Sequence, residues 1–143
     1  MSKLVFLGGT VGNNPWRTKF IQDLVSHGVE HSKLFNPVVA DWTEEAQRRE
    51  EVAKRNASHL MFYLGTPKMD GIPLSTYSMV EATMALYDRA EDTVVVFDPE
   101  GIDSVHSLKA YKQTEKVLRA RFPNANIFST LQEATDWFVK ELT

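Results

Sequence analysis

The sequence has 143 residues, of which 43% are hydrophobic and eight are phenylalanine, enough for one compact domain with its own core. The formal net charge is −3 and the two signs are interleaved, so the chain lacks the basic stripe that binding to a nucleic-acid backbone requires. It has no cysteine, which excludes disulfides, thiolate catalysis and cysteine-ligated zinc, and no apolar run long enough for a signal peptide or a membrane helix. We therefore expect a single cytoplasmic domain over residues 1–143 that binds neither nucleic acid nor membrane.

Strand and helix signals alternate from the amino terminus onward. The apolar run at 4–7 ends at two glycines and is typical of a buried parallel strand. Asn14 and Pro15 predict the start of a helix, with Asn14 as its N-cap and Pro15 as its first helical residue. A short strand at 33–35 and a polar helix at 44–57 follow.

The same alternation continues to the carboxyl terminus. The clearest strand in the chain is 93–97, which is rich in β-branched residues. Thr130 and Glu133 form a capping-box pattern that opens the last helix. In chain order, the expected elements are a strand at 59–64, an apolar helix at 77–87, the strand at 93–97, a helix at 105–121, a weak strand at 126–128 and the last helix.

Five strands that alternate with five helices predict an α/β fold in which a parallel sheet is covered on both faces. The chain length fits a flavodoxin-like three-layer sandwich with the strand order 2-1-3-4-5 and right-handed crossovers. Ligands in such folds bind beyond the carboxyl ends of the strands, at the switch point between the first and third strands. The loops expected there are 8–14, 36–42, 65–75 and 98–103.

Glu81 stands in the almost entirely apolar stretch 77–87, which predicts a well-buried helix. A buried carboxylate costs free energy unless it is paired, hydrogen-bonded or pointed into a cleft. Such a residue is more often structural than catalytic, and here Ser75, Thr76 or a neighbouring backbone group would then satisfy it. Its place after a strand and a Gly/Pro loop favours a functional role.

The turn after the first strand, residues 8–12, resembles a phosphate-binding loop but matches neither the dinucleotide fingerprint nor the Walker pattern. It is either a tight connection or a set of backbone N–H groups, including those of Gly9 and Thr10, that hold an anionic or hydroxyl-rich ligand. Arg17, one turn into the following helix, would add a charged donor to such a site or lie in solvent.

Two tryptophans are candidate surfaces for a nucleobase. Trp42 offers a flat face beside Asp41, which would hydrogen-bond a base edge or carry a proton; otherwise Asp41 caps the next helix and Trp42 packs on its first turn. Trp16 is a second stacking candidate, although its place on an amphipathic helix favours the core.

The remaining polar residues give weaker signals. Asp98 ends the fourth strand and either lines the pocket or forms a turn with Pro99. We expect Glu50 and Glu51 to form a solvated helix face. The four histidines lack metal-ligand spacing, so we assign no metal and no cofactor.

Taken in order, five motifs resemble the nucleoside 2-deoxyribosyltransferase-like family over about residues 3 to 101. The family opens with a small-residue turn and often a Trp-Arg pair, continues with Asn-Pro and an acidic-aromatic loop, and places a Glu in an apolar helix. The matching motifs here are Gly8-Gly9-Thr10, Trp16-Arg17, Asn36-Pro37, Asp41-Trp42 and Glu81.

This resemblance implies that Glu81 attacks the anomeric carbon of a deoxyribosyl group and forms a covalent glycosyl-enzyme, which a second base or water then resolves with retention. It makes Asp41 the proton donor or base-binding group and Trp42 a stacking wall. Ser78, one helical turn before Glu81, would orient the nucleophile. The same chemistry follows from the residues, because a carboxylate nucleophile splits one difficult displacement into two.

The chain also departs from the family pattern. Ser58 stands where members commonly carry an Asp at the end of the second helix, and Ser75 and Thr76 offer hydroxyls where many transferases have a sugar-binding Asp. We therefore expect either a 2-deoxyribosyltransferase, with a free base as second substrate, or an N-glycoside hydrolase, acting on a nucleoside or nucleotide. The alternative is a non-catalytic nucleotide-binding module on the same fold.

The helix at 77–87 predicts an assembly as well. Its apolar residues exceed what one sheet face covers, which favours a homo-oligomer, although its methionines also suit irregular core packing. These residues are Tyr77, Met79, Met84, Leu86 and Tyr87.

Overall fold

The computed structural model of the protein describes residues 3–12, 14–68 and 75–143. Helices and strands alternate along it, with two short 3₁₀ turns, η1 (His31–Lys33) and η2 (Ala90–Asp92). The elements are β1 (Val5–Gly9), α1 (Trp16–Ser26), β2 (Leu34–Phe35), α2 (Glu44–Asn56), β3 (His59–Leu64), α3 (Thr76–Arg89), β4 (Thr93–Phe97), α4 (Val105–Arg121), β5 (Asn126–Phe128) and α5 (Leu131–Leu142). No helix in the described ranges is both long and apolar enough to cross a membrane.

The five strands form one parallel sheet in the order β2-β1-β3-β4-β5. This confirms the predicted order 2-1-3-4-5. Every pair is parallel, so the carboxyl ends of the strands meet at one edge, and β1 and β3 are neighbours over the whole of β1. The loops that follow β1 and β3 therefore lie next to each other, as a switch-point site requires.

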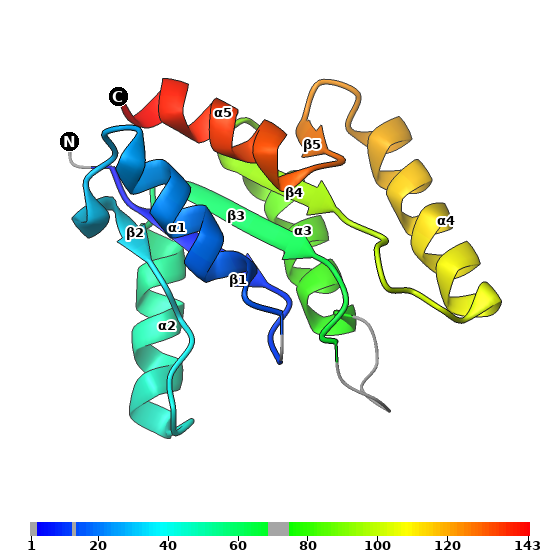
Figure 1. Ribbon diagram of the computed structural model, residues 1–143, viewed down its shortest axis with the longest axis horizontal. Helices are drawn as coiled ribbons and strands as arrows, with labels where there is room; N and C mark the ends of the chain where they lie inside the picture. The colour runs from blue at the N-terminus through cyan, green and yellow to red at the C-terminus, as the bar shows by residue number, and fades with distance from the viewer. Residues whose placement is uncertain (1–2, 13, 69–74) are drawn as a thin grey trace.

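Side chains alternate between two cores on the faces of the sheet. Val5, Leu7, Met61 and Tyr63 pack under α1 and α5, whereas Phe6, Phe62 and Val95 face α3 and α4. Figure 1 shows α1 and α5 on one face of the sheet and α3 on the other. The three layers confirm the predicted α/β sandwich.

The connection from β1 to α1 differs from the prediction. β1 continues through Gly9, and α1 begins at Trp16 with Pro15 as its N-cap and no capping side chain. Asn14 does not cap the helix, because its Nδ2 donates instead to the carbonyl oxygen of Thr66, 2.8 Å away. Asn14 thus joins the loops after β1 and β3. The capping box predicted at Thr130 for α5 is confirmed, whereas α2 is capped by Thr43 and not by Asp41.

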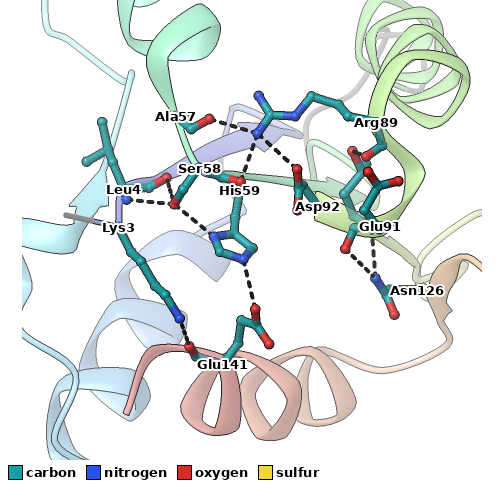
Figure 2. Close-up of polar contacts among 11 residues, drawn as sticks. Lys3, Leu4, Ala57, Ser58, His59, Arg89, Glu91, Asp92, Asn126 and Glu141 are labelled. Carbon is teal, nitrogen blue, oxygen red and sulfur yellow. Dashed lines mark hydrogen bonds and ion pairs between the residues drawn. The ribbon is translucent and has the colours of Figure 1, made fainter. Parts of the chain in front are cut away.

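The opposite edge of the sheet is joined by a polar network (Figure 2). Ser58 Oγ accepts from the Leu4 amide at 2.9 Å and lies 3.0 Å from the Leu4 carbonyl oxygen, linking the starts of β1 and β3. His59 Nδ1 is 2.8 Å from Ser58 Oγ, and His59 Nε2 is 3.3 Å from Glu141 Oε1 on α5. The Ser-His-Glu order is that of a hydrolase triad, but the hydroxyl is engaged by backbone atoms. This network ties α5 to the sheet.

Gly9 shows how closely β1 and β3 approach at the ligand edge. Its φ is +119°, and a Cβ there would lie 2.2 Å from the Tyr63 carbonyl oxygen. Both the backbone conformation and the contact exclude a larger residue.

We expect Gly9→Ala to lower the free energy of unfolding by about 3 kcal/mol or more, because it combines an unfavourable φ with a clash against backbone. Gly28→Ala is the matched control: its φ is +98°, but nothing lies within 4 Å of the new Cβ. We expect that variant to lower the free energy of unfolding by only about 1–2 kcal/mol, because the unfavourable φ is its sole defect. Urea denaturation measures both, and equal losses would contradict the steric explanation.

Candidate active site

A pocket of about 540 Å³ opens at the carboxyl end of β1, between α2 and the start of α3. Its volume lies within the range of small-molecule sites. Five residues that were predicted at the site from the sequence line it: Gly9, Arg17, Trp42, Ser78 and Glu81. They come from the end of β1, the start of α1, the loop before α2 and the first two turns of α3. Trp42 is 59% exposed.

Glu81 is paired with Lys54 across the pocket. The Lys54 ammonium on α2 donates a hydrogen bond to Glu81 Oε2 on α3, and 14% of the Glu81 side chain is exposed. Burial opposes the charge of Lys54, but the hydrogen bond and charge of Glu81, helped by Tyr77 and Glu50, outweigh it and raise the pKa of Lys54. The pair therefore keeps one carboxylate oxygen engaged.

Lys54 was not among the residues identified from the sequence. A signal was present, because a helix that carries Glu50 and Lys54 four residues apart shows both on one face. The Lys54 ammonium also lies 5.5 Å from the centre of the Phe6 ring, which covers the floor of the pocket. Only the tertiary structure brings this face of α2 against Glu81.

Glu50 also lines the pocket, which corrects the expectation of a solvated helix face for this residue; Glu51 is exposed at the rim. Burial raises the pKa of Glu50, and the charge of Glu81 adds to this, while Lys54 and Arg17 act in the opposite direction. Three carboxyl groups thus line the pocket in different surroundings, those of Glu50, Glu51 and Glu81.

Arg17 lines the pocket wall, but its guanidinium is hydrogen-bonded to backbone carbonyl oxygens. Its guanidinium donates to the carbonyl oxygens of Leu7 at 3.0 Å, Gly9 at 3.1 Å and Thr10 at 2.7 Å. The residue is 6% exposed, and burial lowers its pKa to about 10, partly offset by Glu50, so it remains charged at neutral pH. Arg17 therefore closes the carboxyl end of β1, where the sheet leaves carbonyl groups unpaired.

The side-chain hydroxyl groups of Thr10 and Ser75 are hydrogen-bonded to each other. Their hydroxyl oxygens are 2.5 Å apart, and Thr10 Oγ1 also accepts from the Gly65 amide at 2.8 Å. Thr10 is fully buried. The two hydroxyls join the loop after β1 to the end of β3 and the start of α3, and neither lines the pocket described above. The other residues expected in this loop, 69–74, lie outside the described residues.

Three further candidates lie away from the pocket wall. Trp16 is 3% exposed, stacks on Tyr63 and donates from Nε1 to the Thr10 carbonyl oxygen, so its rings are core. Asp98 accepts a hydrogen bond from the Tyr63 hydroxyl and one from the Glu100 amide, which makes it a turn former here. Asp41 is exposed and does not line the pocket.

The α3 helix is less buried than its composition predicts. Residues at every third or fourth position form an exposed apolar strip, and the buried face consists mainly of small residues and Leu86. The strip is formed by Tyr77, Val80, Met84 and Tyr87. The expectation of an all-round buried helix is therefore wrong, because the sheet covers one side of it.

Among the described residues, no three His, Cys, Asp or Glu side chains come together as metal ligands would.

A family model matches the part of the chain that forms this pocket. Residues 2–101 match the model described as nucleoside 2-deoxyribosyltransferase like. The match covers more than half of the chain. The chain belongs to the nucleoside 2-deoxyribosyltransferase-like family. A search of the curated proteins finds no relative that matches it.

The family match includes all pocket residues and ends shortly after β4. Within this segment, the structure gives a structural role to one residue that departs from the family pattern, Ser58. Ser58 lies at the amino end of β3, at the edge opposite the pocket (Figure 2). A serine at this position therefore says nothing about the substrate, whereas Ser75 lies at the ligand edge beside Thr10.

We expect Arg17→Met to lower the free energy of unfolding by about 2–4 kcal/mol, because it leaves buried carbonyl groups without their charged donor. Lys19→Ala on the same helix is the control, since Lys19 pairs with Asp23 on the surface, and its effect should stay within about 0.5 kcal/mol. Thermal unfolding measures both variants. A stable Arg17→Met protein would assign the guanidinium to ligand binding instead.

Proposed function

We propose that the protein cleaves or exchanges the N-glycosidic bond of a (deoxy)nucleoside or nucleotide, with Glu81 as the nucleophile. The observation that carries the proposal is a carboxylate in a pocket of nucleoside size, held by an ammonium group, in a chain of this family. A purely structural Glu81 would have no need of an open pocket beside it.

The geometry of the pair suits nucleophilic attack. Lys54 holds Glu81 Oε2, which leaves Oε1 to form a bond to C1′ of the sugar while the C1′–N bond breaks. The electron pair of that bond departs with the base, and a glycosyl-Glu81 ester remains. A second base or water then attacks C1′ and releases the carboxylate, so two inversions give retention. Base exchange defines a transferase and attack by water a hydrolase.

Other pocket residues take the roles of substrate binding in this proposal. Trp42 stacks on the base, because its exposed ring is the flat apolar surface of the pocket. Ser78, one turn before Glu81, also lines the pocket and would bind a sugar hydroxyl or orient the carboxylate, and the Gly9 backbone would allow the sugar to approach β1 closely. Arg17, Thr10 and Ser75 support these groups from behind.

We expect Glu81→Gln to reduce base release from 2′-deoxynucleosides or their 5′-monophosphates by about 10³-fold or more while binding persists, because an amide retains the size but not the nucleophile. Liquid chromatography of free base, with and without an acceptor base, measures the rate, and calorimetry measures binding. Glu45→Gln, an exposed carboxylate at the start of α2, is the charge-matched control.

Each outcome decides between specific alternatives. Full turnover by Glu81→Gln would remove Glu81 from the nucleophile role. A wild-type protein that binds nucleotides but never releases base would be a binding module on this fold. A glycosyl adduct found by mass spectrometry on the peptide that contains Glu81 would support the covalent route directly.

We also propose that the protein is a homo-oligomer. The exposed strip on α3 (Tyr77, Val80, Met84 and Tyr87) supports this, because an apolar helix face of this kind is usually covered in solution. We expect sedimentation equilibrium to give a mass above one chain and Met84→Lys to shift it toward the monomer. A monomeric wild-type protein would contradict the proposal.

A further inference from the structure

We propose that Glu50 is the proton donor to the leaving base and, in the second half of the reaction, the base that activates the incoming nucleophile. This inference rests on the proposed function and adds to it the acid–base partner of Glu81. Glu50 lies on α2, one helical turn before Lys54, and lines the same pocket as Glu81.

The charged side chains of the pocket wall distinguish Glu50 from Glu81. Lys54 bonds to Glu81 and lies one helical turn after Glu50 on α2, and the charges of both carboxyl groups act on its ammonium. Among the described residues, no cation lies within ion-pair distance of Glu50, whereas Glu81 has Lys54. One carboxyl group is therefore bound to a cation and the other is left open to the pocket.

The surroundings of Glu50 favour its protonated form. Burial raises the pKa of Glu50 above that of an ordinary glutamate, and the negative charge of Glu81 raises it further against the opposing effect of Lys54 and Arg17. Where one carboxylate is held by an ammonium and another carboxyl group in the same pocket has a raised pKa, the second is suited to the role of acid. The group with the raised pKa is the acid.

Glu50 can serve both halves of the reaction, as the acid in the first and as the base in the second. As Glu81 Oε1 forms its bond to C1′, the C1′–N electron pair moves into the base, and the Glu50 carboxyl proton passes to a ring nitrogen of that base. Glu50 is then a carboxylate. It removes a proton from water or from the N–H of a second base as that group attacks C1′ and Glu81 leaves. The cycle returns both carboxyl groups to their starting states.

Asp41 is the competing donor, because the family resemblance assigns it this role. It is exposed and does not line the pocket, whereas Glu50 does. A donor must lie within hydrogen-bond reach of the atom that it protonates. Glu50 lines the pocket that holds Glu81, as a donor to a base bound there must.

The test compares kcat for base release by wild type, Glu50→Gln, Asp41→Asn and the control Glu45→Gln across pH. We expect Glu50→Gln to lower kcat by about 10²- to 10⁴-fold and to abolish the fall in kcat on the alkaline side, where wild type loses the acid. With 7-methyl-2′-deoxyguanosine, whose base leaves neutral without a proton, the same variant should lose far less than with 2′-deoxyguanosine.

The folding of Glu50→Gln is checked separately. The raised pKa of Glu50 means that its contribution to stability is complete below the unfolded pKa and is lost as pH rises through the folded pKa. Above the folded pKa the charged residue thus costs stability, and there Glu50→Gln should unfold at or above the wild-type temperature. Because the side chain is partly exposed, the gain stays below about 1 kcal/mol.

The outcomes separate this inference from the proposed function. If Glu50→Gln keeps the wild-type kcat and alkaline limb, or if Asp41→Asn shows the loss instead, Glu50 is not the donor although the enzyme remains. If Glu50→Gln slows the natural and the N7-methylated nucleoside equally, its role is structural. If wild type releases no base from any nucleoside or 5′-monophosphate, the proposed function fails and this inference with it.

Discussion

The ion pair between Lys54 and Glu81 is the contact on which the site depends. It joins α2 to α3 above the carboxyl end of β1, and these helices flank the pocket. A partly buried carboxylate without a partner would cost free energy in this apolar surrounding, and the ammonium offsets that cost while one carboxylate oxygen remains open. The pair thus explains why a glutamate is tolerated there, and it is compatible with the nucleophile role proposed for Glu81.

Several polar residues near the pocket serve the backbone rather than a ligand. The ends of parallel strands leave carbonyl and N–H groups without ladder partners, and these groups need donors and acceptors when they are buried. Arg17 supplies three donors to the end of β1, and Thr10 with Ser75 satisfies groups of the neighbouring loop. The same residue types at the same loops would bind phosphate or sugar hydroxyls. Sequence position alone does not separate the two uses.

Much of the fold was predictable because its signals are local. The β-branched run of β4 and the capping box of α5 depend on neighbours in the sequence, and both were found where expected. The start of α1 was wrong because Asn14 bonds to Thr66, far along the chain. Glu81 and Trp42 line the pocket at the edge of the sheet where strand order and loop position predict a ligand. Glu50 and Lys54 were missed because helix periodicity does not show which neighbour covers a face.

By itself, the sequence determined the alternation of strands and helices, the parallel sheet order and the family, since these follow from periodicity, caps and ordered motifs. The tertiary structure alone decided which polar groups face the pocket. It turned Trp16 and Arg17 inward to the core and the end of β1, and it brought the Glu50–Lys54 face of α2 against Glu81. The physical reason is that each side chain is satisfied by partners distant in sequence, so its role depends on what packing brings beside it.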